Sequence, residues 1–112
     1  MSQPTDLFLP LEKAIYLFTR VTVPGEGGDK QKFWREVLGF NSPEAIRESI
    51  LDSVKVADLQ FQRQDQYGER YQAVSLIRGV TEISWWVKSG WIVRPGETIA
   101  RFVTAIPQKA QE

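Results

Sequence analysis

Apolar residues change their spacing at Leu59, and this change limits which folds the chain can adopt. Before Leu59 they recur every three or four positions, which is the period of an amphipathic helix. From Leu59 to Ile106 they largely alternate with polar residues, which is the period of a half-buried strand. Helices followed by strands are typical of the α+β class. We therefore predict two or three N-terminal helices packed on one face of a four-stranded antiparallel sheet.

Three segments of the first half carry helix signals of different strength. A short helix is expected within residues 13–23, with an extended exit where the residues become β-branched. A second helix is expected over residues 30–38, ended by Gly39, because glycine commonly follows the last helical turn. The clearest helix begins after Ser42, which can cap it, with Pro43 at the first helical position.

Turn-forming segments divide the second half into four expected strands. Residues 66–69 indicate a hairpin turn, and residues 79–82 and 94–97 indicate two further turns. Within the third of these strands, Gly90 predicts a bulge or a bend, since glycine inside a strand often marks such a site.

The length of 112 residues fits one domain. We expect a polar lead over residues 1–11, one α+β domain over residues 12–107 and a frayed tail over residues 108–112. The lead has neither a basic start nor a long apolar run, which argues against a signal peptide or a membrane span. A cytoplasmic protein that does not bind membranes is therefore expected.

The composition excludes several kinds of active site. The chain has no histidine and no cysteine, so it has no Ser-His-Asp triad, no Cys-His pair and no Cys/His zinc site. Its 14 acids are scattered, so neither a metal site nor a cofactor is expected. The acids are matched by 14 lysines and arginines, and this net charge of zero argues against a grip on long nucleic acid mainly through phosphate neutralisation. A local basic patch is compatible with it.

Charge is unevenly placed in the strand-rich half, where acids lie in or beside turns and arginines lie in strands or at their ends. Tryptophans are interleaved with these arginines. Guanidinium groups form forked hydrogen bonds with phosphate, and aromatic rings stack on bases, so such a sheet face can bind RNA. The alternative is that the arginines protect sheet edges and the rings are ordinary strand residues. The candidate binding surface comprises Arg63, Arg78, Trp86, Trp91 and Arg101.

Lys30 has an unusual place in its expected helix. It precedes Phe33 and Trp34 by three and four residues, which puts it on the apolar side. It also falls in the first turn, where the helix dipole disfavours a cation. A lysine in this position can be directed at an anion near the sheet. The alternative is that its aliphatic stem lies along apolar surface while the ammonium group reaches water.

Five short motifs occur in a fixed order: Gly-Gly-Asp-Lys-Gln-Lys-Phe at 27–33, Leu-Gly-Phe at 38–40, Tyr-Gly-Glu-Arg-Tyr at 67–71, Trp-Ile-Val-Arg-Pro-Gly-Glu at 91–97 and Phe-Val-Thr-Ala-Ile-Pro at 102–107. Together they resemble an uncharacterised bacterial family, the domain of unknown function 6883. Members of that family occur beside toxin-like and antitoxin-like genes or at the ends of large secreted effectors. The predicted layout is also similar to that of small ribonuclease toxins of the barnase, colicin and RelE-like group.

The resemblance implies a set of catalytic residues, namely Lys30, Tyr71, Arg94 and Thr104. In this assignment Lys30 and Arg94 stabilise charge on a phosphate, while Tyr71 orients or deprotonates a ribose hydroxyl. Asp29 stands where the family often has a histidine, which argues against the usual acid–base catalysis of ribonucleases.

Two hypotheses from different classes follow. The first is a toxin-like effector domain, a metal-independent endoribonuclease that acts on RNA through basic and aromatic residues. The second is a non-catalytic protein-binding module, an accessory or antitoxin/immunity-like partner that uses the exposed Trp/Arg sheet face. The first predicts RNA as a ligand, and both allow a cognate antitoxin or other protein partner. The oligomeric state is not predicted by either.

Overall fold

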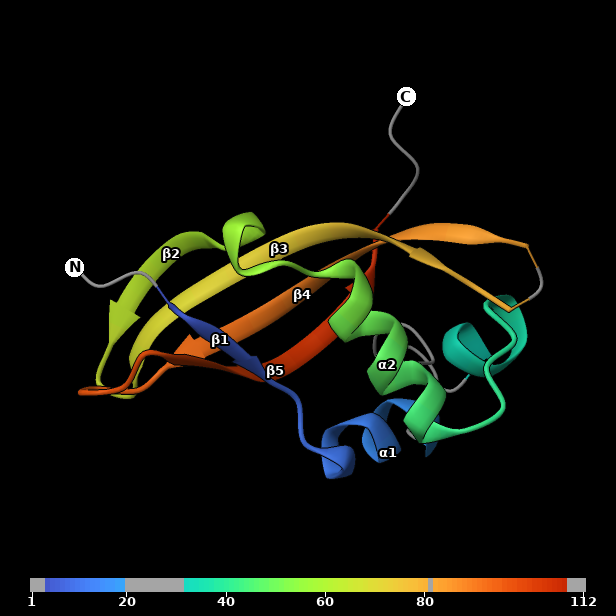
Figure 1. The fold of residues 1–112 in the computed structure, drawn as a ribbon, viewed down its shortest axis with the longest axis horizontal. Coiled ribbons are helices and arrows are strands. Elements are labelled where there is room, and N and C mark those ends of the chain that lie inside the picture. The colour runs from blue at the N-terminus through green and yellow to red at the C-terminus, as the bar shows by residue number, and fades with distance from the viewer. Residues whose placement is uncertain (1–3, 20–31, 81, 109–112) are drawn as a thin grey trace, which may run out of the picture.

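The computed structural model describes residues 4–19, 32–80 and 82–108. Within them, helices lie between a short first strand and a run of four longer strands, in agreement with an α+β fold (Figure 1). The elements are, in chain order, β1 (Asp6–Phe8), α1 (Leu11–Thr19), the π-helix η1 (Lys32–Val37), α2 (Pro43–Ser53), the 3-10 helix η2 (Val56–Asp58), β2 (Gln60–Asp65), β3 (Gly68–Arg78), β4 (Ser84–Val93) and β5 (Ile99–Pro107).

The sheet has five strands in the order β1-β5-β4-β3-β2. Strands β2 to β5 form the antiparallel meander that the alternation predicts. The prediction of a four-stranded, wholly antiparallel sheet is wrong, because β1 pairs in parallel with β5, with Asp6 opposite Ile99. Thr5 supports this pairing, since its N–H donates to the Thr98 carbonyl at 2.8 Å. A three-residue strand before Pro10 is too short to show a period in the sequence.

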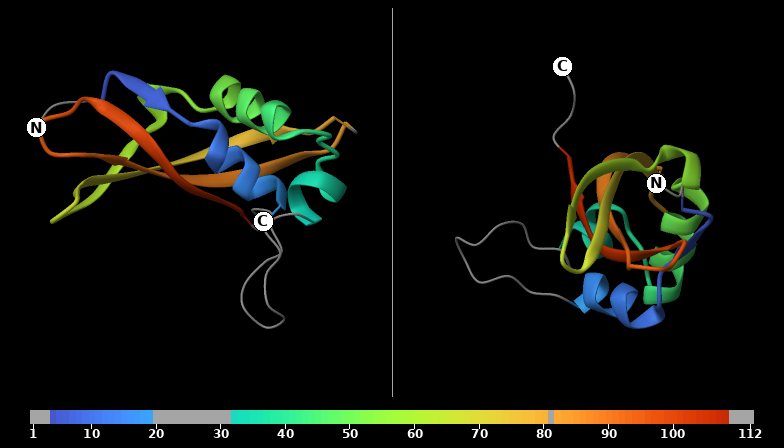
Figure 2. Two further views of the ribbon diagram at one scale, coloured as in Figure 1. Left: turned by 90° about the horizontal axis from the view of Figure 1, so that it is seen from below. Right: turned by 90° about the vertical axis from the view of Figure 1, so that its left-hand side faces the viewer.

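Helices α1 and α2 pack against each other and cover one face of the sheet (Figure 2). The buried positions of β3 follow from this arrangement, because successive side chains point to opposite faces. Tyr71, Ala73 and Ile77 face the helices and are buried, whereas Val74 and Leu76 are exposed on the other face. The sheet therefore has a covered face and an open face.

The start of α2 is the one predicted in sequence. Ser42 has an extended backbone, and its Oγ accepts a hydrogen bond from the Ala45 N–H at 3.2 Å. Pro43 occupies the first helical turn, where its missing N–H costs no hydrogen bond. Ile46 and Ile50 are one turn apart on the buried side of the helix, so α2 packs through an apolar stripe.

Of the helix expected over residues 30–38, the described part forms the π-helix η1, from Lys32 to Val37. Its wider turn appears in the hydrogen bond from the Leu38 N–H to the Phe33 carbonyl, five residues back, at 3.0 Å. Phe33 and Trp34 both enter the core, with ring centroids 5.2 Å apart. Gly39 ends the segment as predicted, with φ of 76°.

The first helix begins at Leu11, two residues before the expected range. Its expected extended exit over residues 20–23 lies outside the described residues, as does the tail beyond residue 108. None of the helices in the described part of the chain is long and apolar enough to span a membrane.

The predicted hairpin turn before β3 is confirmed, and the structure explains why a glycine occupies position 68. Its φ is 139°, and a Cβ at this position would overlap the Val93 carbonyl. An irregularity is predicted at Gly90, and the pairing of β4 with β5 does shift between Gly90 and Trp91, but the additional residue, Val103, lies on β5. Strand β4 itself continues without a break across this point.

Candidate functional site

The open face of the sheet arranges its side chains in rows, because residues paired across neighbouring strands point the same way. One row pairs Gln72 on β3 with Gly90 on β4 and Thr104 on β5. The next row along the strands joins Val74, Lys88 and Ile106. Each row joins a β3 residue to a β5 residue 32 positions later in the chain. The first row is polar, and the second places Lys88 between two apolar side chains.

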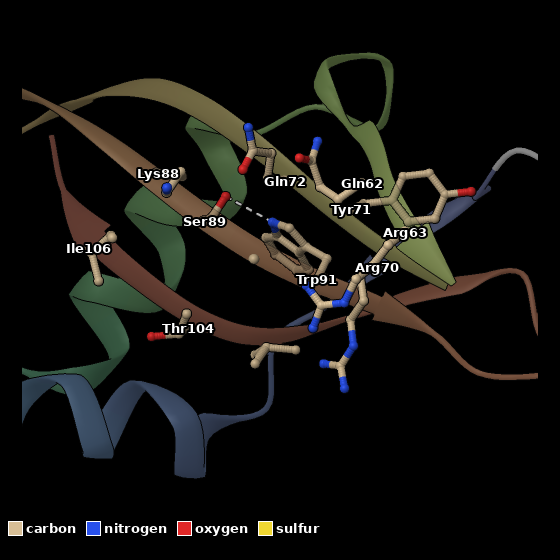
Figure 3. A pocket seen from close by; sticks show the side chains of 12 residues that line it. Gln62, Arg63, Arg70, Tyr71, Gln72, Lys88, Ser89, Trp91, Thr104 and Ile106 are labelled. Carbon is tan, nitrogen blue, oxygen red and sulfur yellow. Dashed lines mark hydrogen bonds between the residues drawn. The ribbon is translucent and has the colours of Figure 1, made fainter. Parts of the chain in front are cut away.

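A pocket of about 230 Å³ lies on this face (Figure 3). All of its lining residues belong to β2, β3, β4 and β5, and none belongs to a helix. The polar side chains around it are cationic or amide- or hydroxyl-bearing, and they comprise Gln62, Arg63, Arg70, Gln72, Lys88 and Thr104. Cations and neutral hydrogen-bonding groups in one pocket favour an anionic ligand.

The charge balance at the pocket is positive. Arg70 donates to the Asp65 carboxylate at 2.9 Å, and Arg63 lies 3.8 Å from the same carboxylate. One carboxylate therefore interacts with two guanidinium groups and offsets the charge of one of them. Lys88 forms no ion pair with any residue in the described part of the chain. An anion entering the pocket meets three cations and one acid that is already engaged.

Asp65 orients the arginines at the end of the pocket formed by the β2–β3 hairpin. Its Oδ1 accepts a hydrogen bond from the Tyr67 backbone N–H at 2.8 Å. That bond, followed by the hydrogen bond from Arg70, lowers the pKa of the Asp65 carboxyl below its ordinary value. The carboxylate thus stays charged well into acid, and it orients Arg70 while closing the hairpin turn.

An Asp65→Asn variant is expected to melt at a lower temperature than wild type at pH 7 and to lose this difference in acid. The folded-state pKa is below the unfolded value, so the stabilisation is present above the unfolded pKa and is lost as the pH falls through the folded pKa. Thermal unfolding of both proteins between pH 7 and pH 2 measures it. Asp52→Asn, on the exposed side of α2, supplies the same chemical change as a control. An equal difference in melting temperature between Asp65→Asn and wild type at pH 7 and at pH 2 would contradict a lowered pKa of Asp65.

Four of the predicted binding residues lie on or beside the open face. Arg63 lines the pocket, and Trp86 lies two residues from Lys88 on β4. Arg101 pairs with Ile92 on the same face, where it forms two hydrogen bonds with the Glu97 carboxylate at 3.1 and 3.2 Å. Arg78 lies at the far end of β3.

Trp91 also borders the pocket (Figure 3), but its side chain is almost wholly buried. It is 1% exposed on the covered face, its indole N–H donates to the Ser89 Oγ at 2.8 Å, and its ring packs edge-on against Phe102. Trp91 therefore packs in the core and offers little exposed area to a ligand. It is five positions from Trp86, and an odd separation along a regular strand places two side chains on opposite faces.

The four catalytic residues implied by the resemblance do not gather at one point among the described residues. Thr104 lines the pocket, whereas Arg94 lies in the turn beyond the end of β4. Lys30 lies outside the described residues. Tyr71 borders the pocket but is 6% exposed, and its hydroxyl points away from Lys88 and Thr104 (Figure 3).

The environment of Tyr71 does not suit a general base. Its hydroxyl donates to the Glu69 Oε1 at 3.0 Å. Burial, and then the hydrogen bond to Glu69, raises the pKa of Tyr71 above its ordinary value. A tyrosine that removes a proton near neutral pH needs a pKa shifted in the opposite direction. Tyr71 acts here as a packed core residue.

Sequence reasoning did not select eight of the twelve residues that line the pocket, namely Gln62, Arg70, Gln72, Lys88, Ser89, Gly90, Val103 and Ile106. A signal for Lys88 existed, because Trp86, Lys88 and Gly90 alternate with the buried residues Val87 and Ser89. The bulge or bend expected at Gly90 concealed this alternation, because an irregularity in a strand changes the face on which the following side chains lie. In the described part of the chain, no three acidic side chains gather as a metal-binding group.

Comparisons with known proteins agree with this architecture. The model of a family described as "Domain of unknown function (DUF6883)" matches residues 12–109. No curated protein sequence matches the chain. A solved contact-dependent growth inhibition toxin–immunity protein complex from Klebsiella pneumoniae 342 contains a similar chain, with a TM-score of 0.67 and 21% identity. The alignment covers 91% of this chain and 93% of that one. At this identity the likeness shows a shared fold alone.

Proposed function

The chain belongs to the family of domain of unknown function 6883, and we propose that it is a toxin-like effector domain that binds and cuts RNA on the open face of its sheet. The pocket carries this proposal. Lys88, Arg63 and Arg70 offer positive charge to a phosphate, and Thr104 offers a hydroxyl beside them. Charge-assisted hydrogen bonds from such groups are the usual means of holding phosphate oxygens.

Trp86 extends the pocket toward a base. It is 43% exposed and lies two residues from Lys88 on the same face, so the two Cα atoms are about 7 Å apart along the strand. A nucleotide whose phosphate is held at Lys88 can therefore stack its base on the Trp86 ring. Stacking of this kind binds single strands with little sequence preference, because every base has an aromatic face.

The proposed reaction suits a chain without histidine or cysteine. In RNA the 2′-oxygen of the ribose attacks the neighbouring phosphorus while the bond to the 5′-oxygen breaks, which leaves a 2′,3′-cyclic phosphate and a 5′-hydroxyl. Water takes the proton that the 2′-hydroxyl loses and supplies the proton that the 5′-oxygen gains, and the substrate provides its own nucleophile. Negative charge builds on the phosphate oxygens in the transition state. Cations already in place in a pocket stabilise that charge, which is often the largest contribution to catalysis. Lys88 is the residue proposed for this role, and Arg70 and Arg63, at the other end of the pocket, are proposed to hold a neighbouring phosphate (Figure 3).

The fold likeness supports the class of this function. The similar chain comes from a complex of a toxin with its immunity protein. We propose that this chain also works in such a pair, with a protein partner that controls it. Fold alone does not establish activity, so the pocket and not the likeness carries the argument for RNA. An RNA-cutting effector acts in the cytoplasm, where its substrate is.

A second function is favoured by the apolar half of the open face. Its side chains, Val74, Leu76, Trp86 and Ile106, are 40 to 48% exposed and lie in adjoining rows. An aromatic side chain amid exposed apolar residues and a polar rim is typical of a protein interface. In this alternative the chain is an immunity-like module that does not cut RNA and binds its partner through this patch.

Inducible expression in a bacterium separates the two functions. For the effector, we expect growth arrest together with new fragments in the total RNA, and the purified protein should produce the same fragments in the presence of EDTA. The Lys88→Ala variant should allow normal growth. An expressed, folded wild type that leaves both growth and RNA unchanged would contradict the effector function and favour the immunity-like one.

A further inference from the structure

Gly90 stands in the middle of β4, where a glycine has a cost. It lies six residues after the start of the strand at Ser84 and three before its end at Val93. Glycine weakens a strand, because it loses more conformational freedom on folding than other residues and packs no side chain. Its presence at this point therefore needs a reason in the backbone, in the packing or in a ligand.

The backbone gives no such reason. The glycines with a left-handed backbone in the described chain are Gly39, Gly68 and Gly96, and Gly90 is not among them. The bulge does not require it either. Gly90 pairs with Thr104 and Trp91 pairs with Phe102, so the additional residue of the bulge belongs to β5.

Packing gives no reason for a glycine either. A Cβ built on Gly90 would meet the Thr104 Cγ2 at 3.7 Å and the Thr104 carbonyl at 4.0 Å, which are ordinary contacts. Gly79, just beyond the end of β3, is a contrast, since a Cβ there would lie 2.6 Å from the Leu38 carbonyl oxygen and 2.8 Å from that of Ile83. The fold thus excludes a side chain at Gly79 and has room for one at Gly90.

That room lies at the centre of the pocket. Gly90 has Gln72 beside it on β3 and Thr104 beside it on β5, and Figure 3 shows these two side chains on either side of β4. Two strand spacings separate the Cα atoms of Gln72 and Thr104, which is about 10 Å. The absent side chain leaves a slot between them with backbone as its floor, next to Lys88.

We infer that Gly90 is the floor of a slot for the phosphodiester backbone of single-stranded RNA, and that it selects this ligand by allowing close approach. The inference rests on the proposed function, since it names the part of the pocket that receives the substrate. A single RNA strand can enter the slot between Gln72 and Thr104, whereas an RNA duplex is too wide for it. A side chain on the floor would lift the phosphate away from Lys88 and Thr104.

The test fills the slot without disturbing the fold. Gly90→Val adds a β-branched side chain that strands favour. Ser84→Val is the matched control, because Ser84 is exposed on the same strand and pairs with Arg78 on the same face, outside the pocket. The probe is a fluorescein-labelled, single-stranded 2′-O-methyl RNA, which binds without being cut. Fluorescence anisotropy gives its affinity, and thermal unfolding gives the stability of each protein.

We expect Gly90→Val to bind the probe at least tenfold more weakly than wild type at an equal or higher melting temperature. Gly90→Ala should lose less affinity, and Ser84→Val should bind as wild type does. Equal binding by wild type and Gly90→Val would overturn the slot while leaving RNA binding in place. A lower melting temperature in both Gly90 variants would overturn it as well, because the fold would then require the glycine. No binding by wild type would overturn both the slot and the proposed function.

Discussion

A Lys88→Ala variant is expected to cut RNA at least a hundredfold more slowly than wild type. Removal of one preorganised donor that faces developing negative charge typically slows an enzyme by about 10² to 10³. Lys88 meets the description because it lines the pocket and forms no ion pair with any described residue. Its charge is thus available to a ligand, unlike that of Arg101, which is engaged by Glu97.

The melting temperature of this variant should match that of wild type, since the Lys88 side chain forms no ion pair with any residue that the structure describes. Lys13→Ala is the control. It also removes one positive charge, but from an exposed position on α1, away from the pocket. Initial rates with a labelled single-stranded RNA measure the effect. An equal loss in both variants would mean that net charge and not the pocket is responsible.

A Trp91→Ala variant is expected to lose about 3 to 5 kcal/mol of unfolding free energy, the usual cost of removing a large aromatic side chain from a core. Trp91 is 1% exposed, its ring centroid lies 5.3 Å from that of Phe102, and its N–H is bonded to Ser89. Such a loss is a large part of the stability of a small domain. Urea or thermal unfolding measures it.

Trp86→Ala is the counterpart on the same strand. Since Trp86 is exposed on the open face, the variant should melt close to wild type. Its affinity for single-stranded RNA should fall by about 1 to 3 kcal/mol, roughly five- to 150-fold, because one base loses its stacking partner. If Trp86→Ala destabilises the fold as much as Trp91→Ala does, the assignment of the two tryptophans to opposite faces is wrong.

Elements with strong local signals could be predicted from the sequence. Ser42 and Pro43 determine the start of α2 through their own chemistry, and Gly68 determines the hairpin turn through its backbone angle. Gly90 marked the bulge because an isolated strand glycine is unusual. Each of these features depends on residues within one element or one pair of strands.

Features that depend on distant parts of the chain could not be predicted. Strand β1 has three residues and exists because Asp6 meets Ile99, far along the chain. The π-helix η1 buries the neighbouring residues Phe33 and Trp34 together, against parts of the chain far from it in sequence. The local sequence gives no signal for such long-range contacts. It therefore predicts a polar lead in place of β1 and an ordinary helix in place of η1.

The candidate site illustrates the same limit. Arginines and tryptophans on strands predicted a binding face, but the face of each side chain depends on the phase of its strand, which separates Trp86 from Trp91. The pocket also depends on register, because Gln72 and Thr104 meet Gly90 only through the pairing of β3, β4 and β5, including the bulge. Residue types therefore predicted a basic and aromatic binding face, and the strand register determines which residues form the pocket on it.

The central claim is that the pocket on the open face receives single-stranded RNA. Amide chemical shifts of the ¹⁵N-labelled protein, followed during titration with an uncut 2′-O-methyl RNA, test it most directly. The account predicts that the largest changes fall on Gln72, Lys88, Gly90 and Thr104, with little change in α1 and α2. Changes that concentrate on the helices, or a spectrum that stays the same at saturating RNA, would contradict it.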